Sequence, residues 1–311
     1  MKNPFQNKTF LLLNFLVIMW GLNWPLTKLA LHDAPPIIFS GLRTLIGGVI
    51  LLFFALRFFR LLRLKELWPI YLISTILNVV LFYGLQTIGI EYLPAGMFSV
   101  IIYIQPVLLG VFSWIWLGET MYGVKMFGFL LGFAGVIIIS LNSLGANMSF
   151  FGVILALCSA IAWALGTVYI KRIGDRVEIT WLVTVQFIMG GLILIVIGTG
   201  LESWSMINWN AGFVSNLLFI SIFVIALGWL AYFILMRSGE VGKIGSYTFL
   251  IPLIAIISSA FILNESISIK SLFGLILIVI SICCVNITPK FIRTKYNEEI
   301  TEFESRKQIF K

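Results

Sequence analysis

The chain has 311 residues, of which 60% are hydrophobic and only 11% are charged, and its mean hydropathy is +1.06. Soluble domains average about 25% charged residues, so this composition excludes an ordinary soluble protein and indicates an integral membrane protein. The net charge of +8 would suggest a nucleic-acid partner in a soluble chain. Here it predicts basic loops beside a membrane, and no nucleic acid is expected.

Ten stretches of the chain are long and apolar enough to cross a bilayer as helices, which takes about 20 residues each. In chain order they are 9–31, 36–56, 67–88, 94–117, 122–141, 150–171, 179–200, 212–236, 245–263 and 270–287. The first follows two lysines, as the apolar core of a signal peptide would. It is too long for that, and no small-residue cleavage site closes it, so we expect it to remain in the mature protein.

The basic residues fall on alternate connections between these stretches. Eighteen of the 21 lysines and arginines lie at the N-terminus, in every second connection and in the tail 288–311. The opposite side has only Lys28 and Lys270, and Arg43 lies inside a span. Because basic loops stay in the cytoplasm, both termini are predicted to be cytoplasmic, with the chain in the inner (plasma) membrane of a bacterium.

An internal repeat organises the chain. Four landmarks recur at an offset of 146 residues, namely Gly96/Gly242, Pro106/Pro252, Glu119/Glu265 and Gly128/Gly274. Upstream, Trp20 and Trp163 match at an offset of 143, as do "LRTLIGG" and "VQFIMGG". Several matches at one spacing are hard to obtain by chance, so a duplicated unit is indicated.

The repeat predicts two halves, 1–145 and 146–287, followed by a cytoplasmic tail, 288–311. Each half has five spans, an odd number, so the second copy must enter the membrane from the opposite side. We therefore expect an all-α integral membrane protein with ten transmembrane helices, as two inverted five-helix repeats around a central cavity. Inverted repeats are typical of secondary transporters.

The leading hypothesis is a secondary carrier that moves a small metabolite by alternating access. Two similar halves in opposite orientation can exchange conformations, which turns a cavity from one side of the membrane to the other. Channels and membrane enzymes can also carry repeats. The alternatives are a channel, or a non-transport membrane protein such as a lipid-modifying enzyme or assembly factor. No buried acid, base or nucleophile set is found, so an enzyme is not expected, nor are a cofactor and a metal site.

The landmarks resemble a known family. Trp20-Gly21 in the first span, Arg43 in the second, and "LGET" at 117–120 with "LNES" at 263–266 are similar to the EamA family of the drug/metabolite transporter superfamily. The resemblance covers about residues 9–287. It implies a ten-helix carrier in the cytoplasmic membrane, often an exporter of amino acids or other small metabolites. It also implies a cavity between the halves, with the fifth and tenth helices more peripheral.

Arg43 lies about seven residues into its span, which is roughly 10 Å along a helix. A charge at that depth is costly, so it should face protein or water. It either contacts a substrate carboxylate or forms a structural bridge to backbone carbonyls and the external loops. Gln186 stands at the equivalent position in the second copy, so any recognition by the charge of Arg43 has no counterpart in the second half.

No acidic residue lies mid-span, which disfavours cationic substrates and favours neutral, zwitterionic or anionic solutes such as amino acids, purines, sugars and organic acids.

An aromatic and polar face is predicted in the first span. Trp20, Asn23 and Trp24 lie on one helical face, and Trp163 with Thr167 forms a similar face in the sixth span. Such a face suits an amphipathic solute in a cavity, with helix–helix packing as the alternative.

Further candidates come from the repeat, which pairs Tyr83 with Trp229 and Gln86 with Tyr232 midway along apolar runs. Polar groups there should face the bundle interior, either toward a cavity or in a packing hydrogen bond. The candidate substrate-binding residues are Trp20, Asn23, Trp24, Arg43, Tyr83, Gln86, Tyr103, Trp163, Thr167, Gln186, Trp229 and Tyr232.

Three further groups have structural interpretations. Pro106 and Pro252 are candidate hinges, or alternatively passive kinks, near the middle of their helices. Glu119 and Glu265 are expected to help start the helices that follow them, together with the next hydroxyl residue. The glycines at 128, 132 and 135 predict a close helix contact, within a monomer or at the seam of a homodimer. The expected partners are therefore a small-molecule substrate, membrane lipid and at most a second copy of the chain.

Overall fold

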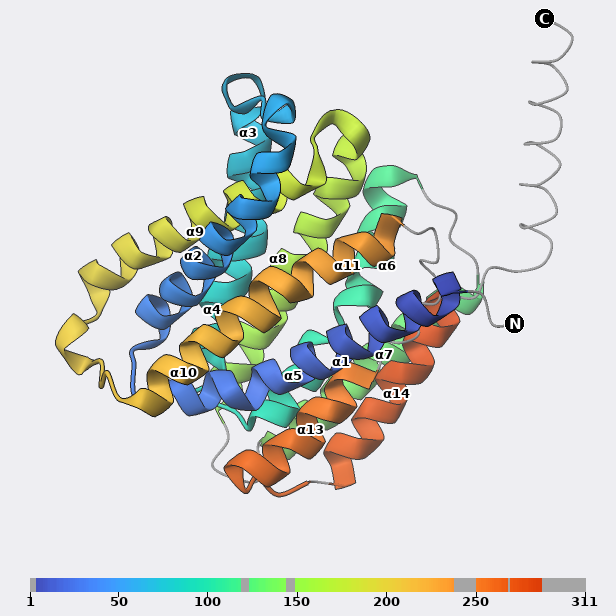
Figure 1. Cartoon of the computed structure of the whole chain (residues 1–311). Helices are drawn as coiled ribbons and strands as arrows, with labels where there is room; N and C mark the ends of the chain where they lie inside the picture. The colour runs from blue at the N-terminus through green and yellow to red at the C-terminus, as the bar shows by residue number, and fades with distance from the viewer. Residues whose placement is uncertain (1–3, 119–122, 144–148, 238–249, 268, 287–311) are drawn as a thin grey trace, which may run out of the picture.

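A computed structural model describes residues 4–118, 123–143, 149–237, 250–267 and 269–286 (Figure 1). Over these ranges the fold is helical, with no strand. The first half contains α1 (Pro4–Ala30), α2 (Pro36–Ala55), η1 (Leu56–Leu61), α3 (Leu64–Thr75), the π-helical η2 (Ile76–Leu81), α4 (Phe82–Gly89), α5 (Ala95–Ile102), α6 (Gln105–Leu117) and α7 (Gly123–Ser143). The second contains α8 (Phe150–Ile173), η3 (Gly174–Arg176), α9 (Ile179–Leu201), η4 (Trp204–Met206), α10 (Ala211–Phe219), the π-helical η5 (Ile220–Leu227), α11 (Gly228–Arg237), α13 (Leu250–Leu263) and α14 (Ile269–Asn286).

The predicted all-α membrane fold is confirmed. Seven helical stretches are long and apolar enough to span a membrane: Thr9–Ala30, Pro36–Leu61, Leu64–Gly89, Ala95–Leu117, Phe150–Ile173, Ile179–Leu201 and Ala211–Tyr232. Three shorter apolar helices fall in the remaining predicted spans, at Gly123–Gly135, Leu250–Leu263 and Leu272–Ser281. The number of ten spans therefore rests on the sequence for these three.

The repeat is visible in the backbone of both halves. The π-helical segments η2 and η5 interrupt the third and eighth predicted spans at matching places in the two copies. Gly118 (φ 67°) and Asn264 (φ 54°), which are 146 residues apart, both adopt the left-handed conformation before their glutamates. Gly and Asn are the residues that tolerate this conformation best, so the shared "L-G/N-E" pattern encodes the same helix ending twice.

The fourth predicted span is not one continuous helix. It breaks at Tyr103–Ile104 into α5 and α6, and Pro106 stands in the first turn of α6. Proline cannot donate to the carbonyl four residues earlier and its ring clashes there, whereas the first turn of a helix tolerates it. Pro106 therefore stands at an interruption near the middle of the stretch Ala95–Leu117, and whether it acts as a hinge or as a passive kink stays a prediction. Pro252 lies at the third residue of α13, and residues 238–249 before that helix are outside the described ranges.

Glycines set the closest helix contacts. The equivalent helices α2 and α9 lie side by side (Figure 1), and a Cβ on Gly191 would lie 2.6 Å from the backbone nitrogen of Leu45. In α7, a Cβ on Gly132 would meet the hydroxyl of Ser281 at 2.7 Å, and one on Gly135 the carbonyl of Gly274 at 2.9 Å. The predicted glycine contact of α7 is thus made within the monomer, against α14.

Carboxylates from the second half cap helices of the first half. Glu265 accepts hydrogen bonds from the backbone N–H groups of Ala95 (2.8 Å) and Gly96 (3.3 Å) and pairs with Lys28 of α1 at 3.1 Å. Glu202 accepts from two N–H groups at the start of α2, at 2.9 and 2.8 Å. The expectation that Glu265 caps the helix after it is therefore wrong, since its carboxylate caps α5. Glu119 lies outside the described ranges.

Candidate functional site

A cavity lies where the two halves meet in the middle of the helix bundle. Its lining side chains leave about 340 Å³ of space between them, a volume that counts the part open to solvent and is therefore not fully enclosed. Its lining comes from α1, α4, α8, η5, α11 and the break between α5 and α6, and consists of Trp20, Asn23, Trp24, Phe82, Tyr83, Gln86, Tyr103, Trp163, Val224 and Trp229. Eight of these ten are residues that the sequence proposed for substrate binding.

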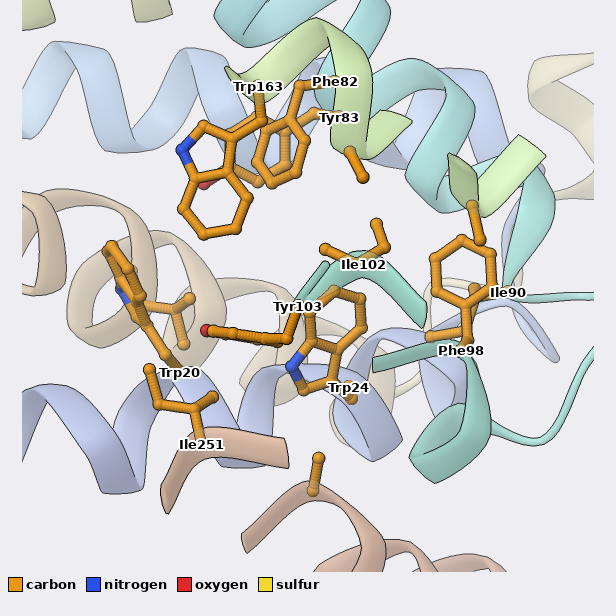
Figure 2. Packing of buried hydrophobic residues seen from close by; sticks show 14 of the residues in the cluster. Trp20, Trp24, Phe82, Tyr83, Ile90, Phe98, Ile102, Tyr103, Trp163 and Ile251 are labelled. Atoms are coloured by element: carbon orange, nitrogen blue, oxygen red, sulfur yellow. The ribbon is translucent and has the colours of Figure 1, made fainter. Parts of the chain in front are cut away.

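Aromatic rings form most of the cavity wall. Figure 2 shows Trp163, Phe82 and Tyr83 on one side of an open centre, and Trp20, Tyr103 and Trp24 on the other. The ring centroids of Trp20 and Trp163 are 6.3 Å apart and those of Tyr103 and Trp163 are 5.9 Å apart, both edge-on. Such edge-to-face contacts are favourable for aromatic pairs and hold the rings around the open space.

Equivalent residues of the two halves meet at this cavity. Trp20 and Trp163, 143 residues apart, are ring neighbours, and the indole nitrogen of Trp229 donates to the hydroxyl of Tyr83, 146 residues away, at 2.8 Å. A duplicated chain brings matching positions together only near the axis that relates its copies. The cavity therefore lies near the axis that relates the two copies.

Two side chains present unpaired polar atoms at the cavity. Gln86 is 1% exposed, and neither its amide nitrogen nor its amide oxygen has a hydrogen-bond partner in the described structure. The indole nitrogen of Trp24 is likewise buried and unpaired. Trp20, by contrast, donates to the carbonyl of Val224 at 3.3 Å. A buried polar atom without a partner costs about 1–3 kcal/mol, so these groups are suited to bind a ligand or water.

Arg43 is fully buried and lies behind the cavity wall instead of lining it. Its guanidinium donates to Thr27 (2.8 Å) and Thr87 (2.5 Å), with a longer contact to Asn23 at 3.5 Å. The charge also lies 5.1 Å from the ring centroid of Tyr83. No ion pair in the described ranges includes it. Arg43 therefore ties α2 to α1 and α4 and leaves a positive charge without a counter-charge one layer from the cavity.

The remaining sequence candidates lie outside the lining. Thr167 donates to the carbonyl of Trp163 at 2.8 Å, and Gln186 accepts from Ser74 at 2.5 Å. The ring of Tyr232 contacts Trp20 at 5.4 Å and Trp229 at 5.8 Å, just behind the wall. Helical spacing alone does not separate such positions from the lining.

Two lining residues, Phe82 and Val224, were not predicted. Both stand in uninterrupted apolar runs, where a cavity-facing residue resembles one that faces lipid or another helix. Phe82 begins α4 directly after η2, and Val224 lies within η5. A π-helix cannot be recognised from apolar residues alone, so the sequence carries no signal for either.

Comparison with known proteins identifies the family. The model of the EamA-like transporter family matches residues 7–141 and again residues 150–287. The chain belongs to the EamA-like transporter family. Its two matched segments make this EamA-like protein a multi-pass membrane protein of a transporter family, in agreement with the resemblance seen in the sequence.

The relatives of this EamA-like protein carry transporter names. "Uncharacterized transporter YvbV" of Bacillus subtilis (strain 168) is 57% identical over 290 residues, 93% of this chain and 95% of the relative. The "Probable amino-acid metabolite efflux pump" of Escherichia coli (strain K12) is 25% identical over 286 residues, 84% of this chain and 89% of the pump. A solved crystal structure superimposes with a TM-score of 0.65 and 16% identity over 89% of this chain and 96% of that one, which supports the fold alone.

Proposed function

We propose that this protein is a secondary carrier that exports a small, amino-acid-like metabolite across the cell membrane by alternating access. The observation that carries the proposal is the aromatic cavity at the meeting of the two halves, with unpaired polar atoms in its wall. Ligand sites are commonly concave and mostly apolar, with a few well-placed polar groups. The name of the Escherichia coli relative, an amino-acid metabolite efflux pump, supports both the substrate class and the direction.

The polar atoms favour a zwitterion with an apolar side chain. The amide of Gln86 offers a donor nitrogen with two N–H groups and an acceptor oxygen, and the indole of Trp24 adds a further N–H donor. An α-amino acid matches this set, because its carboxylate accepts and its ammonium group donates. The uncompensated charge of Arg43 favours the carboxylate, and the surrounding rings favour an apolar side chain.

Alternating access is supported by a contact between the two halves at the C-terminal end of α1, one of the helices that line the cavity. Lys28 of α1 bonds both Glu265 of the second half (3.1 Å) and the carbonyl of Leu93 (2.6 Å). Opening this end requires α1 and α5 to separate from the segment that follows α13. These contacts are partly exposed, with 23% and 14% of the two charged side chains accessible, so water can replace them during a cycle.

The export of amino acids can be tested in cells that express the protein or its Trp163→Glu variant at equal membrane levels. The cells are loaded with amino acids by feeding dipeptides, and amino acids in the medium are measured over time. Faster release of one or more apolar amino acids is expected only with the unmodified protein. Trp209→Glu, at a half-exposed tryptophan outside the cavity, serves as the control that keeps release unchanged. Equal release from all cells for every amino acid would contradict the proposal.

A further inference from the structure

Residues 56–68 comprise η1, the link to α3 and the first five residues of α3, and they form what we call the α2–α3 connection. This connection combines exposed basic and exposed apolar side chains. Its exposed large apolar residues include Phe59 (63%) and Trp68 (58%). Its basic side chains are all exposed, at Arg57, Arg60, Arg63 and Lys65. The single acidic residue, Glu66, is already bonded to Arg63, at 2.6 and 2.8 Å. The connection therefore carries a positive excess beside an apolar surface.

The length of α2 sets the depth of this connection in a bilayer. The 20 residues of Pro36–Ala55 span about 30 Å, which equals the thickness of the hydrocarbon core. When α2 crosses the hydrocarbon from its first residue, the connection that follows lies at the boundary with the phosphate layer, where the apolar stretches Pro36–Leu61 and Leu64–Gly89 meet. Only this layer can place aromatic rings against acyl chains and guanidinium groups outside hydrocarbon at the same time.

Packing holds the connection against the junction of α8 and α9. The indole nitrogen of Trp181 donates to the carbonyl of Phe58 at 2.8 Å, and the Trp181 and Phe59 rings are 6.3 Å apart. A satellite apolar cluster, with Tyr71 and Leu182 at its centre, joins α3 to the same junction. Figure 1 shows the connection at the same end of the molecule as this junction. A fixed surface is thereby built from two parts of the chain.

The junction adds further basic residues to this surface. Arg172 and Arg176 are both exposed, with one acidic residue, Asp175, between them in the sequence. The next acidic residue, Glu178, caps α9 by accepting from the N–H of Trp181 at 2.9 Å. Arginine is the side chain best suited to bind phosphate oxygens in pairs. Clusters of four or more basic residues next to a membrane helix attract anionic lipid.

We propose that residues 56–68, together with Arg172 and Arg176, form a binding surface for an anionic phospholipid. The arginines bind the phosphate and the negatively charged headgroup, while Phe59 and Trp68 lie against the acyl chains. A soluble anion would leave the exposed rings in water, whereas a lipid covers both kinds of surface. The proposal is independent of which metabolite the cavity carries.

Lipid binding can be measured by native mass spectrometry and by melting of the purified full-length protein with added phosphatidylglycerol, phosphatidylcholine or inorganic phosphate. We expect phosphatidylglycerol to bind about tenfold or more tightly than phosphatidylcholine. The Arg57→Gln, Arg60→Gln, Arg63→Gln triple variant should reduce this ratio to below about threefold. Lys270→Gln, at an exposed lysine elsewhere, is the control that keeps the ratio.

Three outcomes would overturn the proposal. They are equal binding of both lipids, an unchanged ratio in the triple variant, and full competition by millimolar inorganic phosphate, which would mark a site for free phosphate. If the triple variant does not fold, the Arg60→Gln variant is measured in the same way. A loss of about threefold in phosphatidylglycerol binding is then expected, and no loss would overturn the proposal.

Discussion

Gln86 presents an amide nitrogen and an amide oxygen at the cavity, and neither is bonded within the described structure. Replacing it by leucine removes two unsatisfied groups, so Gln86→Leu should melt at the same temperature or higher. Substrate transport should nevertheless fall about tenfold or more, because hydrogen bonds to charged groups contribute about 1.5–3 kcal/mol. Melting curves and transport rates of the same preparation measure both effects.

Tyr71 provides the matched control for this variant. Its hydroxyl is also buried and unpaired, but it belongs to the satellite cluster and does not line the cavity. Tyr71→Phe should therefore keep both the melting temperature and the transport rate. Transport by Gln86→Leu at the rate of Tyr71→Phe would show that Gln86 does not bind the substrate.

Arg43 tests whether the charge behind the wall selects for a carboxylate. In Arg43→Met, Thr27 still bonds Asn23 (3.3 Å) and Thr87 still bonds the carbonyl of Tyr83 (2.7 Å), so the protein should fold. Loss of the positive charge should weaken transport of an amino acid about tenfold and that of its uncharged amide analogue much less. Competition by the two compounds against labelled substrate measures the ratio. An equal loss for both would assign Arg43 a structural role.

At the scale of residues, the aromatic candidates could be found from the sequence. Which of them line the cavity and which lie behind its wall could not. Tryptophan and tyrosine within apolar runs are conspicuous, and the repeat paired Tyr83 with Trp229, which the structure joins by a hydrogen bond. The depth of Arg43 along its helix followed from counting residues. Its position behind the wall did not, because that depends on how α1 and α4 pack against α2.

Close approach of α2 and α9 depends on glycine at one helix crossing. A Cβ on Gly191 would lie 2.6 Å from a backbone atom of α2, whereas Gly200, on the same helix, has nothing within 4 Å of its added Cβ. Gly191→Ala should lower stability by about 1–3 kcal/mol through overpacking. Gly200→Ala should leave stability unchanged or slightly raised. Thermal melting of both variants checks this, and equal melting would contradict the proposed close contact.

The pair Lys28–Glu265 joins the two halves and must separate if that end of the cavity opens. In a protein whose native cysteines are replaced, Lys28→Cys with Glu265→Cys can be joined by a short reducible thiol cross-linker. Transport should stop on cross-linking and return after reduction. Arg63→Cys with Glu66→Cys replaces an ion pair within one helix turn and is the control that keeps transport after cross-linking. Undiminished transport by the joined Lys28–Glu265 variant would exclude motion at this contact.

Element positions could be predicted from apolar runs, whereas their interruptions could not. Pro106 marked the place where α5 ends and α6 begins. The sequence around a proline does not show whether the helix bends there or ends and starts again. The role of Glu265 was misjudged for a related reason. Its neighbour in sequence is a serine suited to local capping, and its actual partners lie between 169 and 237 residues away.

At the scale of the molecule, the sequence showed the duplicated unit and the helical membrane fold. The reason is that 146-residue matches and apolar runs are properties of sequence alone. Cytoplasmic termini remain a prediction from the distribution of basic residues. The cavity arises only when equivalent residues of both halves meet, so its volume and its unpaired atoms required the structure.

The central claim, a carrier that alternates around this cavity, is tested most directly by counterflow in proteoliposomes. Uptake of labelled amino acids is measured with and without unlabelled amino acids inside. Saturable uptake that internal substrate accelerates is the predicted result, since a carrier returns faster when it is loaded. Uptake that rises linearly with concentration and ignores internal substrate would indicate a channel. No uptake of any amino acid by protein with an intact melting transition would contradict the proposed substrate class.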